Sequence, residues 1–389
     1  MPKRATDGTC SAGSATLAQL LGMAVPQLQE AQRRAAPRTG PGRPPIYADW
    51  QVAAMIMLAV LKKKKSKSAQ YRFLHENQAH ILPPLGLARL ISRSDYFERY
   101  RQAHHLFVAA VQGQGRTALA EHAANAKAVA ADKSLVRARG PKWDQRDRKR
   151  GVVPKGLRGV DREAAWGYSE YDEWVYGFSY EVIVSATADD DAFPLLVSTG
   201  TASTSEHKTL AAKIPHLPAC TRYVLADSGY DSDPAGEAIE YEPDPRSRCG
   251  RGGNRNRTGG RGRDRAGRGQ RRTGRRFICP SQPRAHGPTP GATRQRGARE
   301  VARQRRWERH RFYKSRSGRA LYARRRQSVE RFNAQFKQLF ELEDRVWHRG
   351  LDNNATMLTC AVFCFQLLVR YNRRTRAKNA CIQWILDAL

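Results

Sequence analysis

The stretch RQSVERFNAQFKQLFEL, from Arg326 to Leu342, predicts a helix near the C-terminal end around which the rest of the chain is organised. At helical spacing its polar side chains fall on one face and its apolar side chains on the opposite face. The polar face consists of Arg326, Glu330, Asn333 and Lys337. Such a charge ladder is commonly a solvated helix surface, and it also suits a site in which a carboxylate lies between two cations.

The overall charge indicates the kind of partner. The 389-residue chain carries 69 Lys and Arg against 36 Asp and Glu, a formal net charge of +33. Nucleic acid is the first candidate, because Lys and Arg replace the counterions condensed along phosphates. Part of the excess lies between Arg246 and Arg306, where 20 arginines accompany one Asp and one Glu. The remainder of the chain is still basic.

The cysteines and the apolar runs bear on the cellular compartment. Seven scattered cysteines form no CxxC pair, and no secretory signal is recognisable, which predicts a reduced cytoplasmic protein. Cys360 and Cys364 lie one helical turn apart and are interpreted as core thiols, with a metal pair as the alternative. The longest apolar run, Trp50 to Leu61, is too short for a bilayer that needs ~20 residues. We therefore expect no membrane partner.

The N-terminal third predicts helices. Residues 1–46 end in RTGPGRPP, whose glycines and prolines break regular elements, and are predicted to be a flexible arm. Residues 47–125 predict an all-helical unit. Its first helix is followed by a cationic cluster that includes Lys62 and Lys63, which would suit contact with phosphates. A DNA-binding domain and a plain helical cap are both compatible with this pattern.

From Lys127 the hydrophobic period changes to that of strands. Four segments are rich in β-branched, alanine or aromatic residues, and a helix is expected just before the last of them. The predicted strands are 127–136, 174–185, 193–201 and 221–226. This order predicts an α/β fold in which helices flank a mixed sheet.

Two segments between these elements are polar. The loop before the second strand carries basic residues and Trp166, which could stack on unpaired bases or simply pack on the sheet. Residues 244–276 are rich in Arg and Gly and nearly free of apolar side chains, which predicts disorder. The wider stretch 244–306 is interpreted either as a disordered insertion or as the product of a shifted reading frame. Arginine-glycine tracts can bind RNA and single strands.

Three carboxylates have positions that suggest chemistry. Asp132 lies in the first predicted strand, Asp227 directly follows the fourth, and Glu330 lies on the C-terminal helix. If the first and fourth strands are neighbours, the two aspartates come side by side and the glutamate closes the site. Convergent carboxylates need cations, and their hard oxygens select Mg²⁺ or Mn²⁺. Two such ions support an in-line phosphoryl displacement.

These carboxylate blocks resemble the DDE transposases of bacterial insertion sequences, whose catalytic domain has the RNase H-like fold. The family signature is Tyr, two residues, Arg, three residues, Glu, six residues, Lys. Arg326, Glu330 and Lys337 fit its spacing, whereas Tyr322 lies one position too early. The resemblance implies that Asp132, Asp227 and Glu330 hold two metal ions. It also implies that Arg326 and Lys337 bind the terminal phosphates.

The resemblance predicts a domain plan and an activity. Residues 126–243 and 307–375 would form the RNase H-like catalytic domain, and 376–389 a basic tail. The expected activity is cleavage of double-stranded DNA at the ends of the element and strand transfer into target DNA. A homodimer is expected in the DNA complex, near the bacterial nucleoid. The alternatives are a decayed, non-catalytic DNA-binding remnant and an RNA-binding arginine-glycine protein.

Overall fold

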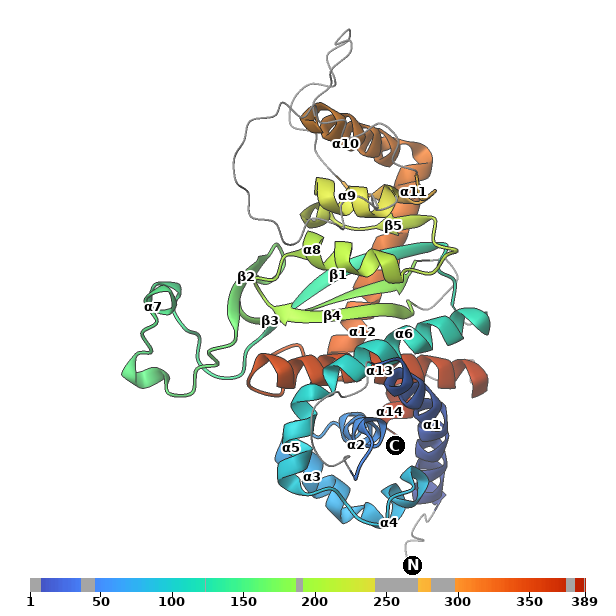
Figure 1. Cartoon of the computed structure of the whole chain (residues 1–389), viewed down its shortest axis with the longest axis vertical. Coiled ribbons are helices and arrows are strands. Elements are labelled where there is room, and N and C mark those ends of the chain that lie inside the picture. The colour runs from blue at the N-terminus through green and yellow to red at the C-terminus, as the bar shows by residue number, and fades with distance from the viewer. Residues whose placement is uncertain are drawn as a thin grey trace, which may run out of the picture.

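A mixed β-sheet occupies the middle of the molecule (Figure 1). The N-terminal helices lie on one side of it, and on the other lie α9 (Asp233–Glu240), α10 (Ala298–Lys314) and α11 (Arg316–Arg325). The computed structural model of the chain describes residues 8–35, 46–122, 124–186, 192–241, 272–280, 298–375, 382–387 and 389. The α/β class and the flanking helices agree with the prediction from sequence. The strands are β1 (Ala128–Arg137), β2 (Ala165–Ser169), β3 (Glu173–Ser185), β4 (Pro194–Thr201), β5 (Tyr223–Leu225) and β6 (Arg276–Ile278).

The sheet places the first strand next to the strand that precedes Asp227. Its order is β2-β3-β1-β5-β6, and β4 also pairs with β3. β1 pairs antiparallel with β3 along its length and parallel with β5 on its other edge. Each of the four strands predicted from sequence corresponds to a strand of this sheet. β2 is an addition from within the polar loop, where AWGYS pairs with the first half of β3.

The N-terminal helices pack into one layer at the lower end of Figure 1. Two of them begin with a serine cap, since the Ser66 and Ser92 side chains accept hydrogen bonds from the backbone N–H of Ala69 and Asp95. The helices are α1 (Gly8–Arg34), α2 (Asp49–Leu61), α3 (Lys67–Glu76), α4 (Gln78–Ile81), η1 (Pro83–Leu85), α5 (Arg93–Gln102) and α6 (His104–Ala120).

Helix α1 falls in the region for which the sequence predicts a flexible arm. The difference has a packing reason, because Leu20, Ala24 and Leu28 recur at helical spacing and are completely buried. The apolar surface that these side chains bury offsets the conformational entropy that the segment loses when it forms a helix. Of the predicted arm, residues 1–7 and 36–45 lie outside the described residues.

The remaining helices differ in position. These elements are α7 (Gln145–Arg150), η2 (Lys155–Leu157), α8 (Glu206–Lys213), η3 (Ile214–His216), η4 (Ser228–Tyr230), α9 (Asp233–Glu240), α10 (Ala298–Lys314), α11 (Arg316–Arg325), η6 (Arg326–Glu330), α12 (Arg331–Leu339), α13 (Leu351–Thr375) and α14 (Ile382–Asp387). Helix α7 lies apart from the sheet, α14 packs against α13, and α11 and α12 bring the C-terminal part of the chain back across the sheet. In Figure 1 the segment from α11 through α12 runs past β5 and β1.

Helix α13 joins the helical layer to the sheet. It packs against α2, α6 and β4, and the buried Gln366 amide donates to the carbonyls of Val111 at 3.0 Å and Pro194 at 2.7 Å. By length and composition α13 could cross a membrane, yet 94% of its apolar window is buried inside the fold. Cys360 and Cys364 are buried free thiols within it.

The predicted disorder and the shifted reading frame concern the arginine-rich stretch 244–306, most of which lies outside the described residues. Two parts of it are described. β6 extends the sheet by pairing in parallel with β5, with Phe277 opposite Val224, and α10 begins at Ala298. Of the predicted basic tail, residues 376–381 and 388 are also outside the described part.

Candidate active site

The parallel pairing of β1 with β5 brings two of the predicted carboxylates together. Ala130 lies opposite Leu225 in the register of the two strands. Asp132 and Asp227 each follow two residues after this pair, so they lie at the same height along the two strands. Neighbouring parallel strands are about 4.8 Å apart, which puts the two side chains within reach of one shared ligand.

One guanidinium nitrogen bridges the two aspartates. Arg325, the last residue of α11, donates through Nη2 to Oδ1 of Asp132 at 2.7 Å and to Oδ2 of Asp227 at 3.4 Å. The Asp132 and Arg325 side chains are only 16% and 11% exposed, whereas that of Asp227 is 41% exposed. The aspartate pair therefore already forms a site for positive charge.

A second group from the same helical segment orients Asp132. The Asn333 amide donates to Oδ2 of Asp132 at 2.8 Å and accepts a hydrogen bond from the Tyr180 hydroxyl at 3.0 Å. The Tyr180 ring is buried and lies edge-on to Phe336, with 5.1 Å between ring centroids. Because both oxygens of Asp132 have a donor, its carboxylate has a defined orientation.

The electrostatics explain why the pair needs a cation. Burial raises the pKa of Asp132 to about 7, and the carboxylates of Asp227 and Glu206 push this pKa in the same direction, while Arg325 opposes them. Burial and a neighbouring like charge both disfavour the ionised form of a carboxyl group. A cation between the aspartates relieves this cost.

Glu206 is an acidic neighbour that was not predicted from sequence. It starts helix α8, and its pKa is raised by burial and by Asp227. A Cβ added to Gly229 would lie 2.4 Å from its Oε2 and 3.2 Å from Oδ1 of Asp227. The absence of a side chain at Gly229 thus lets the two carboxylates approach the same place.

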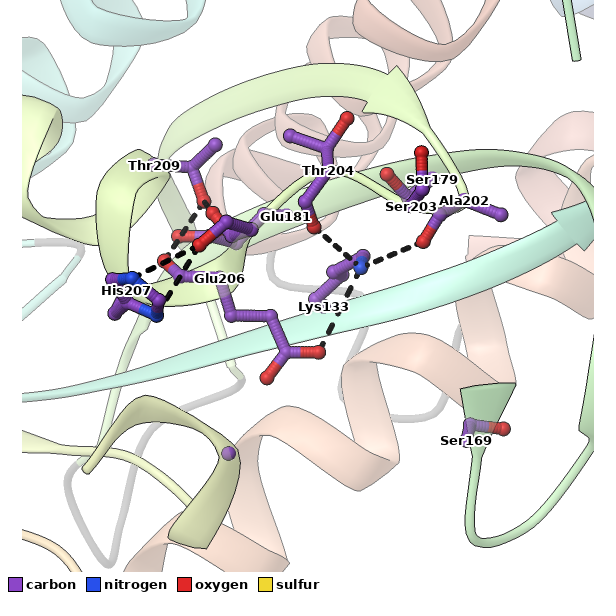
Figure 2. A network of polar contacts seen from close by, with 12 residues as sticks. Lys133, Ser169, Ser179, Glu181, Ala202, Ser203, Thr204, Glu206, His207 and Thr209 are labelled. Atoms are coloured by element: carbon purple, nitrogen blue, oxygen red, sulfur yellow. Dashed lines mark hydrogen bonds and ion pairs between the residues drawn. The ribbon is translucent and has the colours of Figure 1, made fainter. Parts of the chain in front are cut away.

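A polar network on β1 and α8 holds Glu206 in position (Figure 2). Lys133, next to Asp132 on β1, donates to the carbonyls of Ala202 at 3.0 Å and Thr204 at 2.8 Å, and its Nζ is 3.7 Å from Oε1 of Glu206. Successive residues of a strand point to opposite faces of the sheet. On β1, Asp132 therefore faces α11 and α12, whereas Lys133 faces the loop after β4.

The structure does not bring Glu330 to the aspartates. Its side chain is 53% exposed and pairs at 3.2 Å with Arg326, whose side chain is 83% exposed. Among the described residues, no group of three or more His, Cys, Asp or Glu is arranged to hold a metal ion. Lys337 is half-buried in the last turn of α12. Asn333, predicted on the same face as Glu330, is the residue that contacts Asp132 instead.

A π-helical turn separates α11 from α12 and changes which residues share a face. The turn is η6, and it ends at Glu330. A π-turn contains one residue more than an α-turn, and such turns are frequent at functional sites. Tyr322, one residue too far from Glu330 for the family spacing, precedes this turn. Burial raises the pKa of Tyr322, and both Arg325 and Asp227 lie close enough to influence it.

The other predicted DNA contacts are engaged within the protein. Trp166 is half-buried against Tyr176, and its indole N–H donates to the carbonyl of Trp143 at 2.6 Å. Lys62 donates to the backbone carbonyl of Leu389. Lys63 pairs with Asp387 of α14 at 3.6 Å and with Glu341 at 3.9 Å. Contact of these residues with DNA remains a prediction.

The fold and the site together define a class of protein: an RNase H-like α/β domain in which two strands and a late helix bring acidic and basic groups to one edge. The model of the transposase DDE domain matches residues 124–365, more than half of the chain, and the chain therefore belongs to that family. The resemblance seen in the sequence is confirmed at this level. No curated protein and no solved structure matches the chain. Transposases act on DNA.

Proposed function

We propose that this transposase cuts double-stranded DNA at the ends of an insertion element and joins them to target DNA, with Asp132, Asp227 and Glu330 as the catalytic carboxylates. The observation that supports it most is the aspartate pair itself. Two carboxylates from neighbouring parallel strands face one cation, Nη2 of Arg325, at 2.7 and 3.4 Å. A hard divalent cation is suited to the same oxygen donors.

The donor set fits Mg²⁺ or Mn²⁺ at the two aspartates, and Glu330 would have to turn inward to add a third carboxylate. Bound divalent ions supply activation of a water or 3′-hydroxyl and stabilisation of the leaving oxygen, with two ions as the proposed number. Asn333 keeps Asp132 oriented toward the site. Glu206 adds negative charge beside Asp227, which favours a second cation.

The surface around the aspartates suits DNA. Arg326 is exposed beside Glu330 on the turn that leads out of the site, and Lys337 lies on the following helix. We propose that both contact phosphates near the cleaved bond, because exposed cations next to a metal site can position the DNA backbone. A homodimer that holds two ends, and a location with the bacterial nucleoid, belong to the same proposal.

Cleavage of DNA that carries the element ends, with and without Mg²⁺, tests the proposal. Asp132→Asn, Asp227→Asn and Glu330→Gln should each reduce cleavage by at least about a hundredfold, because catalytic groups that act as a unit fail together. Asp344→Asn removes an exposed carboxylate and is the matched control. Binding of the ends by the wild-type protein without any metal-dependent cleavage would instead support the alternative of a non-catalytic DNA-binding remnant.

A further inference from the structure

Arg325 makes an unusual contact with the aspartate pair. Only Nη2 reaches Asp132 and Asp227, at 2.7 and 3.4 Å. The buried Nε of the same guanidinium has no hydrogen-bond partner within the described part of the chain. A buried donor without a partner is costly, so this arginine is held in place less well than its burial suggests.

The same chain contains an arginine that shows how a structural pair is built. Arg370 donates through Nε and Nη2 to both oxygens of Glu121, with Nη2 at 2.7 and 2.8 Å and Nε at 3.3 Å. This fork-like contact is the arrangement that favours arginine in permanent ion pairs. Arg325 instead places one nitrogen between two carboxylates, where a single compact cation would lie.

We infer that Arg325 is a positioning residue that holds Asp132 and Asp227 together in the metal-free protein and must leave them when a divalent cation binds. Two neighbouring carboxylates repel each other unless a cation lies between them. Arg325 supplies that charge before metal binding and therefore competes with the metal for the same oxygens. The inference rests on the proposed metal-dependent function.

The position of Arg325 links this exchange to Glu330. Arg325 ends α11, and Glu330 ends the π-turn that follows it. With Arg325 turned inward, Glu330 is exposed and pairs with Arg326. Withdrawal of Arg325 releases the η6 segment from the aspartates and opens a place for the Glu330 carboxylate. Metal loading and recruitment of the third carboxylate thereby become one step.

Binding of Mn²⁺ to the full chain without DNA, followed by electron paramagnetic resonance, tests the inference. Arg325→Gln should bind Mn²⁺ about tenfold more tightly than wild type, a difference of about 1.4 kcal/mol. Arg319→Gln removes an equal charge from an exposed position on the same helix and should change the affinity less than twofold. The metal-free melting temperature of Arg325→Gln should fall, and Mn²⁺ should raise it more than it raises that of wild type.

Equal or weaker Mn²⁺ binding by a folded Arg325→Gln protein would overturn the inference, because the guanidinium would then be no competitor. If this variant does not fold, Arg325→Met also removes the charge and keeps an unbranched apolar side chain, so it should bind Mn²⁺ about tenfold more tightly than wild type. Unchanged binding by this variant would overturn the inference. Mn²⁺ affinity that is unaffected by Asp132→Asn would reject the metal site itself and thus the proposed function.

Discussion

Replacement of Asn333 by alanine should lower the metal affinity and the cleavage rate of the candidate active site without removing a carboxylate. The side chain lies between Asp132, to which it donates at 2.8 Å, and the Tyr180 hydroxyl, from which it accepts at 3.0 Å. Its loss leaves one oxygen of Asp132 without its donor and leaves a buried hydroxyl without its acceptor. The carboxylate can then rotate away from the orientation that a cation requires.

The size of the effect follows from the two hydrogen bonds. A hydrogen bond to a charged group contributes about 1.5–3 kcal/mol, and one between neutral groups contributes about 0.5–1.5 kcal/mol. We therefore expect Asn333→Ala to lower Mn²⁺ affinity or the cleavage rate by roughly 10- to 100-fold. Tyr180→Phe should cause a smaller loss. The double variant should lose less than the sum of the two single losses, because the Tyr180 hydroxyl acts through Asn333.

The assays are Mn²⁺ titration and single-turnover cleavage of DNA ends, with the melting temperature recorded for each variant. Gln335→Ala removes another amide side chain from α12, two residues away, and serves as the control. A folded Asn333→Ala protein whose Mn²⁺ affinity and cleavage rate both stay within twofold of wild type would refute the reasoning. Fully additive losses for Tyr180→Phe and Asn333→Ala would show that the two side chains act separately.

Two further predictions concern the stability of the scaffold. Lys213→Met leaves the Glu181 carboxylate buried without the cation that lies 2.7 Å away. The free energy of unfolding, measured in urea, should therefore fall by about 3–5 kcal/mol. The second substitution Glu181→Gln should recover much of that loss, and a double variant without any recovery would contradict this account. Burial lowers the pKa of His348 to about 3. As the pH falls below about 6.5, the imidazole is protonated in the unfolded chain but not in the folded one, so the folded state loses stability. Between pH 7.5 and 5.5 the free energy of unfolding of the wild type should fall by roughly 1.4 kcal/mol more than that of His348→Gln, and equal losses would argue against a neutral buried imidazole.

Local sequence patterns predicted the strands well. The alternation of aromatic and β-branched residues in β3 and the short apolar run of β5 have no competing helical period. The neighbouring positions of β1 and β5 were a condition of the site hypothesis, and their register meets it. β2 was missed because five residues within a polar loop carry too little pattern. Its pairing depends on β3, not on its own sequence.

The arrangement of the candidate site was predicted only in part. Asp132 and Asp227 could be found because each is an acidic residue within or directly after an apolar strand. Arg325 lies in a run of three arginines, and the sequence does not distinguish it from its two neighbours. The π-turn that follows Arg325 could not be predicted from the sequence either. The same turn places Asn333 toward Asp132 and Glu330 toward solvent, whereas uniform α-helical spacing puts both on one face.

The way α13 bridges α2, α6 and β4 limits how this transposase can evolve. The helical layer and the sheet share side chains such as Gln366, which reaches a carbonyl on each side. If the N-terminal helices were exchanged for those of a relative, the buried side chains of α13 would no longer fit the side chains of α2 and α6. The N-terminal helices and the sheet should therefore change together in evolution, through coordinated substitutions along α13.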